Sequence, residues 1–250
     1  MLKMIKYEYR RIIGFLGIVF GSLVVLEILF LLGSALDMNG ISAFSFAVLT
    51  LEISLGYIVI LSAGIKTYSD DLKKKEGYLV FMTPISSYGI LAAKMISTFL
   101  AGVSFVVISV IFEMINFDII GAEFNIKEFM NFMAFAFKDA GIDYRLAIFI
   151  AFLLFLIAFY MIITMAYFAI SISATILQNK KGKGIISVVI FVVFYIIITI
   201  VADAVKPDVV TINNFSDAML SVLPQYIVYL TVAVLSYFGA AYLLDKKISL

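Results

Sequence analysis

The sequence lacks both cysteine and histidine. Without cysteine the chain has no disulfide and no thiolate zinc site, and without histidine it has no Ser-His-Asp triad, histidine metalloprotease site or usual haem ligand. These absences exclude most kinds of intramembrane enzyme. The phosphate-binding pattern Gly-x-x-x-x-Gly-Lys-Ser/Thr is also absent, so the chain does not hydrolyse ATP by itself in the P-loop manner.

Charged side chains are scarce as well. They make up 14% of the 250 residues, whereas hydrophobic residues make up 64%. A soluble domain has about half apolar and a quarter charged residues, so this composition predicts an integral membrane protein. The net charge of +1 gives no reason to expect nucleic acid as a partner. Arginine occurs only at positions 10, 11 and 145 among abundant Lys, Ile and Phe, which suits an AT-rich bacterial genome.

Long apolar runs predict the fold class. A hydrocarbon core about 30 Å thick requires roughly 20 apolar residues per helix. We therefore predict an all-α, single transmembrane domain over 1–250, with six spans at about 13–36, 43–66, 90–117, 146–178, 184–203 and 223–244. Before the first span, Leu2, Ile5, Tyr9 and Ile12 share one helical stripe beside basic residues, which predicts an interfacial elbow helix over 1–12.

The basic residues predict the orientation, because Lys and Arg collect on cytoplasmic loops. Four segments hold fourteen of the eighteen basic residues: the N-terminal segment, the loop between spans two and three, the loop between spans four and five, and the C-terminal tail. The opposite side has Lys127, Lys138, Arg145 and Lys206. We expect both termini in the cytoplasm and the protein in the cell membrane of a bacterium.

The outer loops carry two further signals. Asn125 to Glu128 has the spacing of a capping box and precedes an apolar stretch, which predicts a short helix on the outer bilayer surface. Lys206-Pro207 ends a helix, and Val209 to Val222 followed by Pro224 predicts one or two short helices that enter from the outside before the sixth span. The first of these helices either caps the bundle or takes part in gating.

The polar stretch from Lys66 to Lys94 is the part of the sequence that is most informative about function. It places an acidic pair and a lysine run before Glu-Gly, an apolar patch and Thr-Pro, which predicts a short amphipathic helix within 67–89. A plain topological loop is the alternative, because basic residues gather on cytoplasmic loops in any case. The candidate partner-binding residues are Asp70, Asp71, Lys73, Glu76, Gly77, Tyr78, Leu79 and Pro84.

The order of these residues resembles the loop between the second and third spans of the type-2 family of ABC transporter permeases. The matching positions are Asp71, Glu76, Gly77, Leu79, Pro84, Ser86 and Lys94, and with six spans the resemblance covers the whole chain. The resemblance implies that this loop is a coupling helix docking into a separate ATP-binding subunit, which would hold the ATP and magnesium. It also implies a second permease subunit, identical or related, and no cofactor bound by this chain.

Three acidic residues lie inside predicted spans: Glu27, Glu52 and Glu113. A carboxyl near the bilayer centre costs about 2.5–3.5 kcal/mol on insertion scales, so each requires a reason. The predicted topology places all three in the outer half of the membrane, where they either line an export pathway or serve as hydrogen-bonded structural groups.

The leading functional hypothesis is a permease subunit of an ATP-driven exporter of a small molecule, peptide or lipid-like cargo. A membrane scaffold or regulatory protein that recruits a cytoplasmic partner through the same loop is the second hypothesis. A membrane enzyme using Glu27, Glu52 or Glu113 is the third, although no spacing supplies a nucleophile or a partner for acid–base catalysis.

Overall fold

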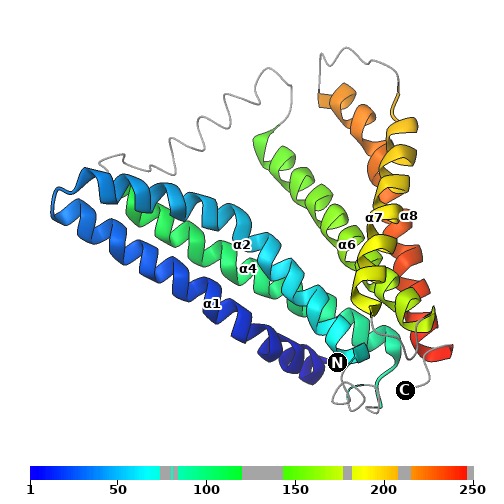
Figure 1. Ribbon diagram of the computed structural model, residues 1–250. Coiled ribbons are helices and arrows are strands. Elements are labelled where there is room, and N and C mark those ends of the chain that lie inside the picture. The colour runs from blue at the N-terminus through cyan, green and yellow to red at the C-terminus, as the bar shows by residue number, and fades with distance from the viewer. Residues whose placement is uncertain (74–79, 81–83, 120–142, 177–181, 208–214, 247–250) are drawn as a thin grey trace. The chain divides into compact units, whose positions relative to one another are not determined.

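The described residues of this computed structural model, 1–73, 80, 84–119, 143–176, 182–207 and 215–246, are all-helical (Figure 1). Their six helices are α1 (Leu2–Ala35), α2 (Asn39–Lys73), α4 (Ser87–Ile119), α6 (Tyr144–Ile176), α7 (Lys183–Ala204) and α8 (Phe215–Lys246). All six are long and apolar enough to cross a membrane. The predicted fold class is confirmed, in that the described residues are helical and include six helices suited to cross a membrane.

Helices α1 and α2 extend well beyond the predicted spans. The residues assigned to an elbow helix, 1–12, form one continuous helix with the first span, because neither proline nor a helix-ending turn separates them. Helix α2 continues to Lys73, so Asp70 and Asp71 are helical rather than part of a loop. Most of the predicted coupling helix, 74–79 and 81–83, lies outside the described residues.

The segment before the last span also differs from the prediction. Residues 208–214 lie outside the described part of the chain, but from Phe215 onward the chain is helical, and Pro224 is inside α8. Residues 215–222, predicted to belong to short separate helices, are therefore continuous with the last span. The predicted outer helix that follows Asn125 falls within 120–142, again outside the described residues.

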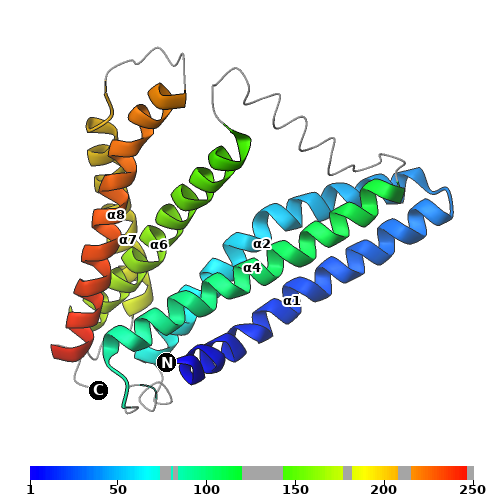
Figure 2. The same cartoon turned by 180° about the vertical axis from the view of Figure 1, so that it is seen from behind.

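The chain divides into two compact units, Met1–Phe124 and Asn125–Leu250. In the first unit α1, α2 and α4 pack against one another, and two opposite views show them side by side along their length (Figures 1 and 2). A tight turn joins α1 to α2. There Asp37 has a φ of 54°, a left-handed conformation that aspartate tolerates better than most residues.

Glycines allow the helices of the first unit to approach closely. A Cβ on Gly33 would lie 2.8 Å from the backbone nitrogen of Ser42, so the α1–α2 turn requires glycine there. Between α2 and α4, Gly56 contacts the ring of Phe105, and a Cβ at this position would overlap that ring. The core beside these contacts is apolar, with Leu16, Leu23, Leu49, Ile60 and Phe105 fully buried.

The second unit consists of α6, α7 and α8. Its core joins Met161, Met165 and Ala233 to aromatic rings of α7 and α8. The turn into α7 is held by a hydrogen bond from the Ser173 hydroxyl to the carbonyl of Lys183, 2.7 Å long. Gly182 precedes the helix with a φ of 108°, which glycine adopts without strain.

Candidate functional site

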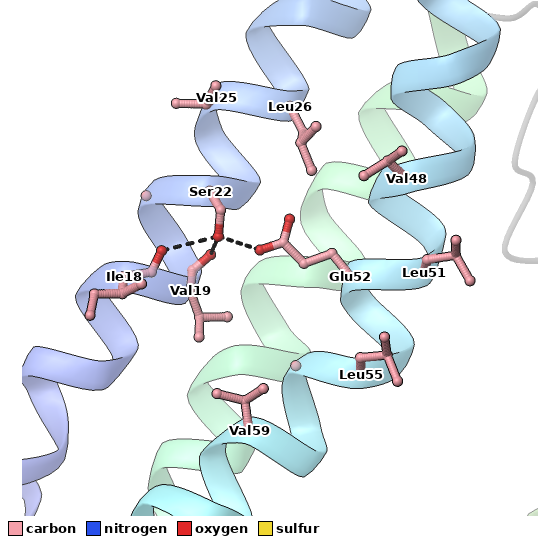
Figure 3. A pocket seen from close by; sticks show the side chains of 12 residues that line it. Ile18, Val19, Ser22, Val25, Leu26, Val48, Leu51, Glu52, Leu55 and Val59 are labelled. Carbon is pink, nitrogen blue, oxygen red and sulfur yellow. Dashed lines mark hydrogen bonds between the residues drawn. The ribbon is translucent and has the colours of Figure 1, made fainter.

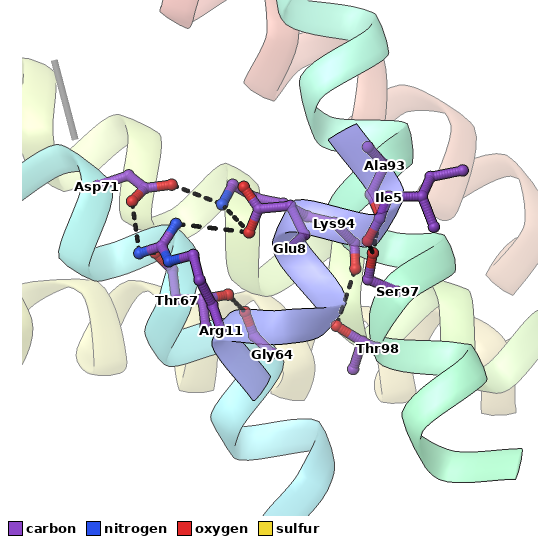
Figure 4. Close-up of polar contacts among 10 residues, drawn as sticks. All are labelled: Ile5, Glu8, Arg11, Gly64, Thr67, Asp71, Ala93, Lys94, Ser97 and Thr98. Atoms are coloured by element: carbon purple, nitrogen blue, oxygen red, sulfur yellow. Dashed lines mark hydrogen bonds and ion pairs between the residues drawn. The ribbon is translucent and has the colours of Figure 1, made fainter. Parts of the chain in front are cut away.

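Four charged side chains meet where α1 begins, α2 ends and α4 begins (Figure 4). The Lys94 ammonium lies 2.8 Å from Glu8 Oε2 and 2.5 Å from Asp71 Oδ2. The Arg11 guanidinium lies 2.7 Å from Asp71 Oδ1 and 3.4 Å from Glu8 Oε2. Each cation thus contacts both carboxylates, and we call these four residues the charge cluster.

The charge cluster is buried and electrically balanced. The side chains of Lys94, Glu8 and Asp71 are 0%, 1% and 2% exposed, and only Arg11, at 26%, reaches the surface. Removing one member of a buried ion pair typically costs about 3–5 kcal/mol, because the remaining charge has no partner and no water. The cluster therefore fixes the relative positions of three helix ends.

Neighbouring polar contacts reinforce this junction. The Ser97 hydroxyl on α4 lies 3.0 Å from the carbonyl of Ile5 on α1. On α2, the Thr67 hydroxyl donates to the Gly64 carbonyl at 2.7 Å, next to the guanidinium of Arg11 (Figure 4). The helices are close enough here that a Cβ on Gly64 would overlap Thr98.

One residue from the predicted coupling segment also packs at this junction. Val80 is buried in an apolar cluster with Met4 of α1 and with Ile90 and Ala93 of α4. The chain between α2 and α4 is therefore attached at both ends to the charge cluster and, through Val80, to the apolar contacts beside it.

The predicted partner-binding residues divide into three groups. Asp71 is buried in the charge cluster and faces α1 and α4. Asp70 is half-buried on the last turns of α2, whereas Lys73 and Pro84 are exposed. Glu76, Gly77, Tyr78 and Leu79 lie outside the described residues.

Two of the three acidic residues of the spans meet between α1 and α4. Glu27 is 7% exposed, and its Oε2 accepts a 3.1 Å hydrogen bond from the side-chain amide of Asn116. Glu113 precedes Asn116 by one helical turn and is near enough to Glu27 for the two carboxylates to repel one another when both are ionised. Asn116 is 1% exposed, so this hydrogen bond is shielded from solvent within the unit.

The third acidic residue faces a different place. Glu52 on α2 lies in a groove of about 850 Å³ between α1 and α2, and its Oε1 lies 2.5 Å from the Ser22 hydroxyl of α1 (Figure 3). The groove is otherwise apolar, with walls formed by residues such as Ile18, Val25, Leu51, Leu55 and Val59. The three acids thus do not form one cluster.

Sequence reasoning missed four residues of these sites: Glu8, Arg11, Ser22 and Asn116. A detectable signal existed for Glu8, because it follows Met4 and precedes Ile12 and Leu16 at helical spacing on what proves to be the buried face of α1. The stripe chosen from sequence instead included Leu2, which is exposed. Arg11, Ser22 and Asn116 gave no comparable signal, since the nearest partner of Arg11, Asp71, and the partners of Ser22 and Asn116 lie on other helices.

Comparisons with protein-family models, with curated proteins and with solved structures find no match to this chain. Within the described residues no group of three or more acidic side chains is placed to hold a metal ion. The functional interpretation therefore depends on the charge cluster, the acids of the spans and the groove.

Proposed function

We propose that this chain is the membrane-spanning permease subunit of an ATP-driven exporter of the ABC type. The sequence order within Lys66–Lys94 suggests this role, and the charge cluster is the observation that supports it best. Under this proposal the loop between α2 and α4 binds a separate ATP-binding subunit on the cytoplasmic side of a bacterial cell membrane.

The charge cluster is suited to transmit force from that loop. Asp71 stands two residues before the end of α2 and Lys94 lies in the second turn of α4, so their ion pair joins the two helices that flank the loop. Arg11 and Glu8 extend the connection to α1. A displacement of the loop by a partner would move these three helices together rather than bend one of them.

The remaining parts of the proposal follow from the absent P-loop and from the span acids. Energy would come from ATP and magnesium bound by the partner, and a second permease chain would complete the transport pathway. Glu27, hydrogen-bonded to Asn116, and the nearby Glu113 would contribute polar groups to that pathway between α1 and α4. The cargo would be a small molecule, a peptide or a lipid-like compound.

A charge reversal in the loop tests the proposal. In the complex purified with its ATP-binding subunit, Glu76→Lys should uncouple ATP hydrolysis from transport while membrane insertion is retained. Asp203→Lys is the matched control, because it makes the same change in charge at an exposed residue of α7 outside the loop. Unchanged coupling in Glu76→Lys would remove Glu76 from this role, and transport without nucleotide would contradict the proposal as a whole.

A further inference from the structure

The groove between α1 and α2 combines apolar walls with a single acidic group. Of its lining residues, only Ser22 and Glu52 have polar side chains, and Glu52 is the only titratable one. Its volume of about 850 Å³ is within the range of small-molecule sites, about 300–1,000 Å³. Ile18, Val25, Leu51 and Leu55 are exposed, so the groove is open at the surface of the unit.

The carboxyl of Glu52 is incompletely satisfied within the protein. Ser22 is its hydrogen-bond partner among the described residues, and this hydroxyl is also within bonding distance of the carbonyls of Ile18 and Val19, at 3.1 and 3.0 Å. One hydroxyl proton serves all three acceptors. Figure 3 shows the second carboxyl oxygen pointing away from Ser22, towards Leu26.

A carboxylate in such surroundings is stabilised by a positive charge from outside the chain. No Lys or Arg lines the groove, and an isolated carboxylate in apolar surroundings costs far more free energy than a paired one. We propose that this groove is a binding site for a lipophilic organic cation, whose apolar groups contact the α1 and α2 walls and whose charge lies beside Glu52. Such a ligand reaches the groove from the lipid phase.

Glu52 and Gly21 have separate roles in this site. Glu52 selects for positive charge, because Coulomb attraction in a medium of low dielectric is strong at contact distance. Gly21 provides space: a Cβ built on it meets nothing within 4 Å, although the residue lines the groove. A larger side chain at this position would fill the groove without disturbing the packing of α1.

Binding of tritiated tetraphenylphosphonium to the full-length chain in lipid nanodiscs tests the proposal. We expect saturable binding to the parent, and a loss of affinity of at least about ten-fold in Glu52→Gln, from the loss of Coulomb attraction. Asp203→Asn removes the same charge from an exposed residue elsewhere and should bind as the parent does. Equal affinity in Glu52→Gln and the parent, or binding that does not saturate, would overturn the proposal.

Two glycine-to-leucine variants, which differ in whether the new side chain enters the groove, make the test independent of any effect of Glu52→Gln on folding. Gly21→Leu should abolish or strongly weaken binding, whereas Gly14→Leu should not, because Gly14 has equally open space but does not line the groove. Equal binding by these two variants would contradict the assigned site. If the permease proposal holds, lipophilic cations would also be a class of cargo for the exporter. Binding without ATP-dependent export would refute this role as cargo but not the binding site.

Discussion

Lys94 and Asp71 form an ion pair of 2.5 Å between two helices, and both side chains are almost completely buried. The pair joins the end of α2 to the beginning of α4, the two helices that flank the loop proposed to bind an ATP-binding subunit. Asp71, a residue predicted to bind a partner protein, thus contacts two other helices of its own chain. The consequences for stability and for coupling are measurable.

Removal of the buried ammonium should strongly destabilise the protein. Lys94→Met leaves Glu8 and Asp71 with only Arg11 as a cationic partner in the cluster, and we expect a loss of about 3–5 kcal/mol in the free energy of unfolding. Lys73→Met, at an exposed lysine that ends α2, should change the free energy of unfolding by less than about 0.5 kcal/mol. Equilibrium unfolding in mixed micelles measures both, and equal losses would show that the cluster is not stabilising.

Neutralising both members of the pair should cost less than the sum of the two single changes. The double variant Lys94→Met with Asp71→Asn removes one positive and one negative charge. Arg11 remains opposite Glu8, so the charges left in the cluster still balance. Residues in one ion-pair network typically show coupling energies of about 0.5–3 kcal/mol. A double-mutant cycle provides this value, and strictly additive losses would contradict direct coupling.

The close contact of α2 and α4 should make Gly56 intolerant of a methyl group. Gly56→Ala would place its Cβ against the ring of Phe105, and overpacking of this kind costs about 1–3 kcal/mol. Gly17→Ala is the matched control on α1, because a Cβ built on Gly17 meets nothing within 4 Å. This substitution should stabilise the helix by about 0.5–1 kcal/mol. Thermal unfolding of both variants checks the prediction, which fails if they shift stability in the same direction.

The hydrogen bond between Asn116 and Glu27 should contribute to the association of α1 with α4. Asn116→Leu removes the amide that donates to Glu27 Oε2, and a buried acceptor that loses its donor costs about 1–3 kcal/mol. In the variant Glu27→Leu with Asn116→Leu both polar groups are gone, so part of the stability should return. If the double variant is less stable than Asn116→Leu alone, Glu27 has another stabilising role.

The helices of this fold were predictable to a large extent, because each apolar run is near the length that a bilayer requires. Both ends of α7 agree with the prediction to within one residue, but the end of α2 does not. Because Asp70, Asp71 and Lys73 are polar, the sequence predicts that the second span ends at residue 66, whereas burial of Asp71 among charges of α1 and α4 allows α2 to continue to Lys73. A local sequence pattern does not show which residue of another helix will pair with a given charged side chain.

The candidate sites show the same limit. Glu27, Glu52 and Glu113 were recognisable, since an acid within an apolar run is conspicuous. Their partners were not: Ser22 and Asn116 come from other helices, and which acid faces which helix depends on the rotation of each helix about its axis. The groove beside Glu52 likewise requires the packing of α1 against α2 and has no signature in sequence.

We propose that this chain works with a separate ATP-binding subunit. Affinity purification of a tagged copy from its own host in mild detergent tests this, with mass spectrometry and an ATPase assay of the product, and with Glu76→Lys purified in parallel. We expect a stoichiometric protein carrying a P-loop that is retained by the parent and lost from Glu76→Lys. If no P-loop protein accompanies the parent under several gentle conditions, the permease proposal is contradicted, and a scaffold that recruits another kind of partner takes its place.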